Sequence, residues 1–149
     1  MTDPVEILRS ARAAVLHDWP SEDVPHALVH AGLDVTFQGG PDPDDLYVMR
    51  LVDGRPETSP VTALPERADI VYSHRPAAEL PGLLAEAQRL GAATLWHQSG
   101  RNEDGEKDPT GVFLTPSEAE HMAALAHAAG VAFVSAPYIV AAAAAARSR

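Results

Sequence analysis

The sequence contains no cysteine among its 149 residues. This absence excludes disulfide bonds, thiolate metal ligands and a cysteine nucleophile, and it is consistent with a cytoplasmic protein. Long apolar runs are also missing, because the longest, residues 138–146, is far shorter than the roughly 20 residues of a membrane-spanning helix. The first residues lack the basic and apolar regions of a signal peptide. We therefore expect a cytoplasmic protein without a membrane partner.

Basic residues are scarce. The chain has 11 lysines and arginines against 21 acidic residues, and its formal net charge is −10. A surface this acidic repels polynucleotides, so we expect no nucleic-acid partner. A small polyanionic ligand would need positive potential concentrated at one spot. The length suits a single domain over residues 1–149 with a full core.

Short apolar runs alternate with helical patterns along the chain. Strands are predicted at residues 13–18, 35–37, 47–52, 70–72, 94–96 and 131–134. Helices are predicted after Asp3-Pro4, from residue 23 to Gly32, over 77–90, from a capping box at Thr115 to Gly130, and in the alanine-rich last segment. Residues 55–67 carry three prolines and are expected to form a loop with at most a short edge strand. The alternation predicts an α/β fold with a mostly parallel sheet and helices on both faces.

Glycine is absent from the turn after the first predicted strand. In nucleotide-binding α/β proteins this turn is usually glycine-rich and holds phosphates. Here residues 17–25 read HDWPSEDVP, with three acids. The following helix start offers N–H groups to an anion, and Arg75 is expected at the same edge of the sheet. Glu22 and Asp23 would compete with a phosphate there, so a phosphate site and a simple capped helix both stay open.

Histidines leave three predicted strands at the same edge of the sheet, namely His17, His74 and His97. A metal or acid–base site is one interpretation, but no element carries metal-ligand spacing, which favours ordinary polar residues at strand ends. The sequence also lacks a GxSxG elbow, a GxGxxG fingerprint and a P-loop. We therefore predict no catalytic and no metal-binding residues, and a function without catalysis is favoured.

One segment of the second half, ADIVYSHRPAAELPGLLAEAQRLGAATLWHQSG, joins a strand ending in Arg75-Pro76, an apolar-striped helix and a strand end with Trp96, Gln98 and Gly100. It resembles the small bacterial CoA-binding proteins, which are related to the CoA-binding domain of succinyl-CoA synthetase. The first half matches more loosely. The resemblance implies a Rossmann-like three-layer sandwich, with a mostly parallel sheet of about five strands and helices on both faces.

The same resemblance implies non-catalytic binding of CoA, acyl-CoA or a related adenine nucleotide at the carboxyl edge of the sheet. The first turn of that family typically carries a small-residue G-x-S pattern, where this chain has HDW. The implied cofactor-binding residues are His17, Asp18, Trp19, Pro20, Ser21, Val24, Gly39, Gly40, Pro41, His74, Arg75, Pro76, Gln98 and Gly100.

Two further hypotheses stay open. In the first, the protein is a ligand-free interaction or regulatory protein that keeps the fold. Trp19, Glu22 and Asp23 would then occupy the former phosphate site. In the second, an edge strand near residues 47–52 pairs with a second copy of the chain to give a homodimer.

Overall fold

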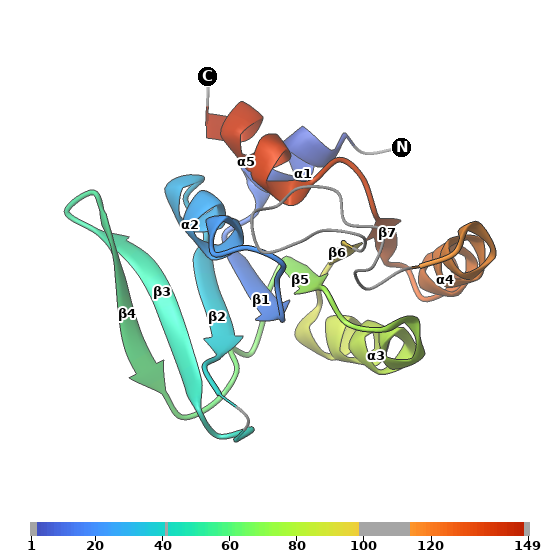
Figure 1. Ribbon diagram of the computed structural model, residues 1–149, viewed down its shortest axis with the longest axis horizontal. Coiled ribbons are helices and arrows are strands. Elements are labelled where there is room, and N and C mark those ends of the chain that lie inside the picture. Colours follow the sequence, from blue (N-terminus) through green and yellow to red (C-terminus); the bar gives the residue numbers. More distant parts are fainter. Residues whose placement is uncertain (1–2, 41, 99–113, 148–149) are drawn as a thin grey trace.

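The computed structural model describes residues 3–40, 42–98 and 114–147. Within these ranges the strands form one sheet in the order β4-β3-β2-β1-β5-β6-β7 (Figure 1). The strands are β1 (Ala13–His17), β2 (Asp34–Gln38), β3 (Leu46–Val52), β4 (Arg55–Val61), β5 (Ile70–Ser73), β6 (Thr94–His97) and β7 (Ala132–Val134). The helices are α1 (Pro4–Ser10), α2 (Asp23–His30), α3 (Leu80–Leu90), α4 (Pro116–Ala128) and α5 (Ile139–Arg147), and a 3₁₀ turn η1 (Ala77–Glu79) precedes α3.

The expectation of a mostly parallel sheet is confirmed, but the expected number of about five strands is wrong. Among the residues that the structure describes, the sheet has seven strands: β1, β2, β5, β6 and β7 run parallel, and β3 and β4 add an antiparallel hairpin at one edge. Strand β4 lies in the proline-rich segment 55–67, which was expected to form a loop with at most a short edge strand, and it is a seven-residue strand at the edge of the sheet. Prolines are tolerated on an edge strand, where a missing N–H on the outer side costs no ladder hydrogen bond.

The β3–β4 hairpin also changes the basis of the homodimer hypothesis. Residues 47–52 lie in β3, which is paired with β2 on one side and β4 on the other, so the expectation that this strand is an edge is wrong. Asp53 and Gly54 connect β3 to β4 with φ angles of 53° and 78°. A two-residue hairpin turn of this kind needs positive φ at both positions, and Asp-Gly is one of the preferred pairs.

Helices cover both faces of the sheet, which gives three layers (Figure 1). Successive strand residues point to opposite faces, so Leu16 packs under α1, α2 and α5, whereas its neighbour Val15 packs under α3 and α4. The first core includes Leu8, Leu28, Val29, Val35, Tyr72, Trp96, Ile139 and Ala142. The second includes Val71, Leu80, Leu83, Leu84, Ala87, Leu95, Met122 and Ala126. In the described ranges, the structure has no helix with the length and apolar character needed to span a membrane.

The predicted helix ends are formed by local hydrogen bonds. The Thr115 hydroxyl accepts from the Glu118 N–H at 3.1 Å, and the Glu118 carboxylate accepts from the Thr115 N–H at 3.0 Å, so the predicted capping box is confirmed. The Asp3 carboxylate accepts from the Val5 N–H at 2.9 Å at the start of α1. Gly91, with φ of 70°, ends α3 in the left-handed conformation that glycine favours.

The order of the strands places one reversal of winding inside the sheet. The chain passes from β1 to β2 on one side of β1, and later returns to β5 on its other side. The carboxyl ends of β1, β2 and β5 are therefore neighbours. In open α/β sheets this reversal is where ligands bind, outside the carboxyl ends of the strands.

Candidate functional site

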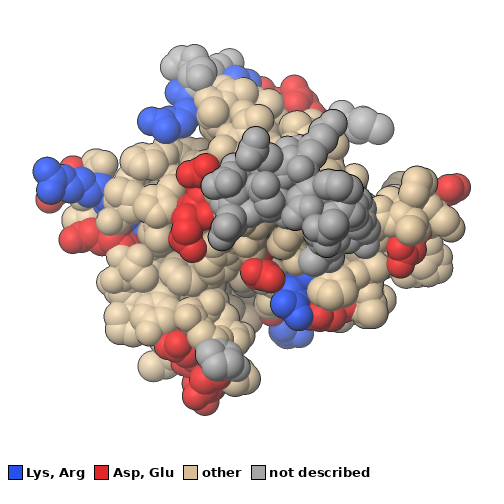
Figure 2. Space-filling view, viewed as in Figure 1, with Lys and Arg blue, Asp and Glu red and all other residues tan. Residues whose placement is uncertain are grey.

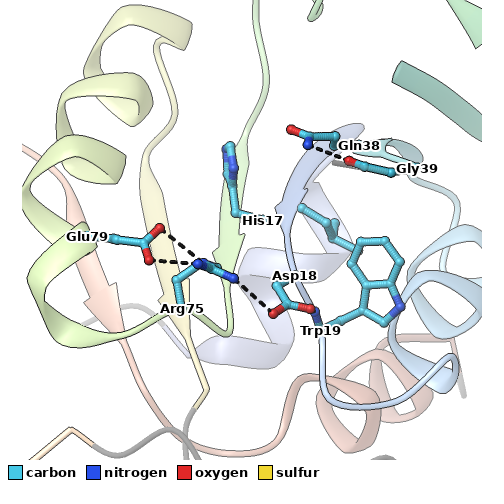
Figure 3. A pocket seen from close by; sticks show the side chains of 9 residues that line it. His17, Asp18, Trp19, Gln38, Gly39, Arg75 and Glu79 are labelled. Atoms are coloured by element: carbon cyan, nitrogen blue, oxygen red, sulfur yellow. Dashed lines mark hydrogen bonds and ion pairs between the residues drawn. The ribbon is translucent and has the colours of Figure 1, made fainter. Parts of the chain in front are cut away.

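A pocket of about 600 Å³ lies at the carboxyl ends of β1, β2 and β5 (Figure 3). Its wall comes from the end of β1 and the turn after it, from the end of β2, and from the segment between β5 and α3. The lining residues are Leu16, His17, Asp18, Trp19, Gln38, Gly39, Gly40, Arg75 and Glu79. Six of these are predicted site residues. The prediction missed Leu16, Gln38 and Glu79.

Arg75 is paired with two carboxylates of the pocket (Figure 3). Its Nε and Nη2 donate to Glu79 at 3.0 and 2.8 Å, and its Nη1 lies 3.4 Å from Asp18 Oδ2. The hydrogen bond from Arg75 lowers the pKa of the Glu79 carboxyl. A phosphate that bound Arg75 would have to displace or share these acids. The sequence signal for Glu79 was its place four residues after Arg75, a spacing that brings opposite charges together at a helix start.

Asp18 explains how this turn forms without glycine. Its φ is 63°, in the left-handed region that glycine favours and that aspartate and asparagine tolerate better than other residues. The Asp18 Oδ1 accepts from the N–H of Trp19 at 2.9 Å, which fixes the start of the turn. The carboxylate therefore shapes the backbone and also reaches Arg75.

Trp19, in the turn after β1, belongs to a row of three aromatic rings with Phe37 of β2 and Tyr47 of β3. Its ring meets Phe37 edge to face with centroids 5.3 Å apart, and Phe37 stacks on Tyr47 at 5.9 Å. The indole Nε1 donates to Glu22 at 3.3 Å. Trp19 is therefore held against the pocket wall, with the cavity beside it.

The glycines after β2 are required by close packing. A Cβ on Gly39 would lie 2.3 Å from Cε2 of Tyr47, and one on Gly40 would lie 2.8 Å from Oδ2 of Asp45. The Gly39 N–H donates to the Asp45 carbonyl at 2.7 Å. A hydrogen bond with the Asp45 carboxylate raises the pKa of the Tyr47 hydroxyl. The backbone of Gly39 and Gly40 therefore forms the β2 wall of the pocket, and the Asp45 carboxylate lies directly beside Gly40.

The start of α2 is largely satisfied by its own turn. The buried Ser21 accepts from the Asp23 N–H through Oγ at 3.2 Å, and its carbonyl accepts from the Val24 N–H at 3.0 Å. The cap position itself is Glu22, which makes no side-chain capping hydrogen bond. Pro25 has no N–H, and the Val24 side chain lies in the core. Of the N–H groups offered to an anion, those of Ser21 and Glu22 remain without a partner shown in the described part of the chain.

His17 lines the pocket and also contacts helix α3, which covers one face of the sheet. Its Nε2 contacts the carboxylate of Glu86, a buried acid on the sheet-facing side of α3. Arg89 Nη2 lies 3.6 Å from the other Glu86 oxygen. Glu86 was not predicted. Its sequence signal was an acid among the apolar positions of the α3 stripe.

The remaining predicted residues lie away from the pocket or outside the described ranges. The buried His74 has its Nδ1 3.0 Å from the Gln98 carbonyl. The Gln98 side chain donates to the Ser135 carbonyl at 3.1 Å and accepts from the Ile139 N–H at 2.6 Å, so it joins the end of β6 to the start of α5. Pro20 is buried, and Pro76 is exposed before η1. Pro41 and Gly100 lie outside the described residues.

The three histidines expected at one edge do not share a site. His97 is 1% exposed and stacks on Phe133, and burial together with the nearby His74 lowers its pKa to about 4. His17 instead contacts Glu86. Across residues 3–40, 42–98 and 114–147, the structure contains no group of three or more histidine, aspartate or glutamate side chains placed to hold a metal ion.

The strand order, the three layers and a pocket at the winding reversal define an open α/β fold of the Rossmann type. Residues 14–142 match the model of the CoA binding domain family. This match covers most of the chain, so the protein belongs to the CoA binding domain family.

Solved structures share the fold at low identity. The crystal structure of Prb, the PH1109 protein redesigned for binding, matches with a TM-score of 0.59 and 20% identity over 100% of this chain and 94% of that one. The structure of cell-free ID.343 from Thermus thermophilus matches with a TM-score of 0.55 and 21% identity over 95% of this chain and 96% of that one. No curated protein matches the chain. Because both identities are low, these structures show a shared fold and nothing about the ligand.

Proposed function

We propose that this protein is a cytoplasmic, non-catalytic binding module for CoA, acyl-CoA or a related adenine nucleotide. The observation that carries the proposal is the pocket at the winding reversal, because it is lined by the ends of three strands in a chain of the CoA binding domain family. Ligands of open α/β sheets bind at this place.

The residues of the pocket fit the adenosine diphosphate part of such a ligand. The volume of about 600 Å³ lies in the usual range for small-molecule sites. Gly39 and Gly40 present backbone without side chains to the pocket, and the Trp19 ring offers an aromatic surface to a base. Arg75 is the one lysine or arginine among the described lining residues, so it is the cation proposed for the diphosphate.

A phosphate can compete for Arg75 because the existing ion pairs are partly exposed. The side chains of Arg75, Asp18 and Glu79 are 42%, 49% and 46% exposed. Exposed pairs of this kind contribute about 0–1 kcal/mol. A phosphate that binds the guanidinium in a bidentate way makes stronger charge-assisted hydrogen bonds. Binding therefore exchanges Asp18, the more distant acid, for a ligand oxygen.

Titration calorimetry with CoA, acetyl-CoA, ADP, NAD and FAD tests the proposal. We expect at least one adenine nucleotide to bind with a dissociation constant well below millimolar. Arg75→Gln should weaken that binding. Arg50→Gln removes an exposed arginine of β3 that pairs with Asp34 of β2, and it should leave the binding unchanged. The absence of any binding below millimolar would overturn the proposal.

A second candidate function is an interaction or regulatory protein that keeps the fold without a ligand. It is favoured by two contacts that acids make with lining residues of the pocket: Glu22 accepts from Trp19 Nε1, and Asp18 pairs with Arg75. The double variant Glu22→Gln, Asp23→Asn separates the two functions. A gain in nucleotide affinity would show that these acids substitute for phosphate, and a loss of helix stability without binding would support the second candidate.

A further inference from the structure

Gln38 lies at the position where Rossmann-type folds have the residue that binds the ribose. It ends β2, about 20 residues after the turn at Asp18, and its side chain lines the pocket (Figure 3). At this place an acid usually binds the 2′-hydroxyl of a ribose, beside its 3′-hydroxyl, and a nearby arginine usually accommodates a 2′-phosphate. Gln38 is an uncharged amide whose Nε2 donates to the Gly40 carbonyl at 2.5 Å, which leaves its oxygen to accept from a hydroxyl and its second N–H to donate to one. It supplies no charge to bind a phosphate.

The surroundings of Gln38 are acidic. The carboxylate of Asp45 lies against Gly40, where an added Cβ would be 2.8 Å from its Oδ2. Asp42 and Asp44 belong to the same β2–β3 turn, and the Asp42 carboxylate accepts from the Asp44 N–H at 2.9 Å. Figure 2 shows acidic atoms gathered over this turn. A phosphate on the ribose would therefore approach carboxylates.

No cation of the described pocket lining balances these acids. Arg75 follows β5, and β1 separates β5 from β2 in the sheet, so Arg75 lies on the other side of the pocket from Gln38 (Figure 3). Its guanidinium is also already held by Asp18 and Glu79. Arg75 is thus placed to bind the 5′-diphosphate. On the side of the ribose, the pocket has the amide of Gln38 and the carboxylate of Asp45 beside it.

We infer that the pocket selects adenine nucleotides with free ribose hydroxyls and discriminates against a 3′-phosphate on the ribose. This inference rests on the proposed function and narrows it. The ligand class is that of ADP and its esters, such as dephospho-CoA, in preference to CoA itself. Gln38 binds the ribose hydroxyls, Arg75 binds the diphosphate, and Asp45 repels a phosphate at the ribose.

Dephospho-CoA and CoA form a matched pair of probes, because they differ only in the 3′-phosphate. Calorimetry with the full chain at low salt should give about tenfold tighter binding of dephospho-CoA, which is the effect of one unfavourable charge contact near a surface. The difference should shrink as salt is added, because screening weakens interactions between exposed charges. Inorganic phosphate at the same ionic strength controls for general anion effects.

Asp45→Asn tests the residue that causes the discrimination. The asparagine keeps the size of the side chain next to Gly40 and removes its charge. It should raise the affinity for CoA several-fold and leave that for dephospho-CoA unchanged. Asp53→Asn, in the exposed hairpin turn, is the matched control and should change neither affinity.

The outcomes separate this inference from the proposed function. Tighter binding of dephospho-CoA, with the difference reduced by Asp45→Asn, supports the inference. Equal or tighter binding of CoA overturns the inference and leaves the proposed function standing. Failure of both probes, and of acetyl-CoA, ADP, NAD and FAD, to bind overturns the proposed function and the inference with it.

Discussion

Arg75 and Asp18 meet across the ends of the neighbouring strands β5 and β1, with Nη1 of the guanidinium 3.4 Å from Oδ2 of the carboxylate. The same guanidinium is held by Glu79 from its other side. The cation of the pocket is thus neutralised by acids of the pocket before any ligand arrives. Asp18 has two roles, because its positive φ also forms the glycine-free turn.

Asp18→Asn should therefore raise the affinity for the nucleotide. Asparagine tolerates the left-handed conformation as well as aspartate does, so the turn is kept while the charge that holds Arg75 is removed. We expect a gain of about three- to fivefold, in line with the about 0–1 kcal/mol of an exposed ion pair. Asp53→Asn is the control for calorimetry, because Asp53 also has a positive φ and lies in the remote hairpin turn. Unchanged affinity in Asp18→Asn would contradict the competition between Asp18 and phosphate.

Gly39→Ala should close the β2 side of the pocket and destabilise the fold. The new methyl would meet the Tyr47 ring at 2.3 Å, and that ring is stacked on Phe37. Overpacking of this kind costs about 1–3 kcal/mol, which urea denaturation can measure. Gly82→Ala is the matched control, because this helix position has no atom near the added Cβ. It should stabilise α3 by about 0.5–1 kcal/mol. A neutral Gly39→Ala would show that the Tyr47 ring moves freely.

The elements predicted correctly from the sequence are those with local signals at both ends. The Thr115 capping box predicts the start of the helix at Pro116, and Gly91 predicts the end of α3. Strand β4 was expected to be a loop with at most a short edge strand, because two prolines argue against a strand and only the edge position makes them harmless. Local composition does not reveal which strand is an edge, since that depends on pairing across the sheet.

The candidate site was predicted in position more fully than in chemistry. His17, Asp18 and Arg75 were placed at one edge because parallel strands bring their carboxyl ends together. The partners of these residues come from other elements, and their identity depends on packing. Glu79 and Glu86 each contact a predicted residue. The contact of Glu79 with Arg75 is local and follows from their spacing, whereas the contact of Glu86 with His17 depends on how α3 lies on the sheet.

The contact between His17 and Glu86 should be measurable as a coupling in the free energy of unfolding. Glu86 is buried on α3, so loss of its partner leaves a buried polar group. We expect Glu86→Gln and His17→Gln each to destabilise the fold by about 1–3 kcal/mol. The double variant should lose less than the sum, with an interaction energy above about 0.5 kcal/mol in a double-mutant cycle. Glu120→Gln, on the exposed face of α4, is the control. Strict additivity would show that the contact contributes nothing to stability.

Stability should depend on pH through His97. Burial, together with the nearby His74, lowers the pKa of His97 from 6.5 to about 4. The effect of burial on the pKa outweighs that of a backbone hydrogen bond with Ser73, which favours the charged ring, so the folded protein keeps the ring neutral above about pH 4. Between pH 6.5 and 4 the unfolded chain binds a proton at this residue and the folded chain does not. Above pH 6.5, protonation of His97 therefore has no effect on the free energy of unfolding. As the pH falls from 6.5 toward 4, the free energy of unfolding decreases.

His97→Phe should remove this dependence. Phenylalanine keeps an aromatic ring beside Phe133 and cannot be protonated. The difference in unfolding free energy between the variant and the original protein should change by about 1.4 kcal/mol per pH unit within this window, or about 3 kcal/mol across it. Urea denaturation at several pH values between 4 and 7.5 measures the difference, and groups that titrate in both proteins cancel. His127→Phe, at an exposed position of α4, is the control, and its free energy of unfolding should depend on pH in the same way as that of the original protein. Parallel curves for His97→Phe would show that His97 is protonated in the folded state.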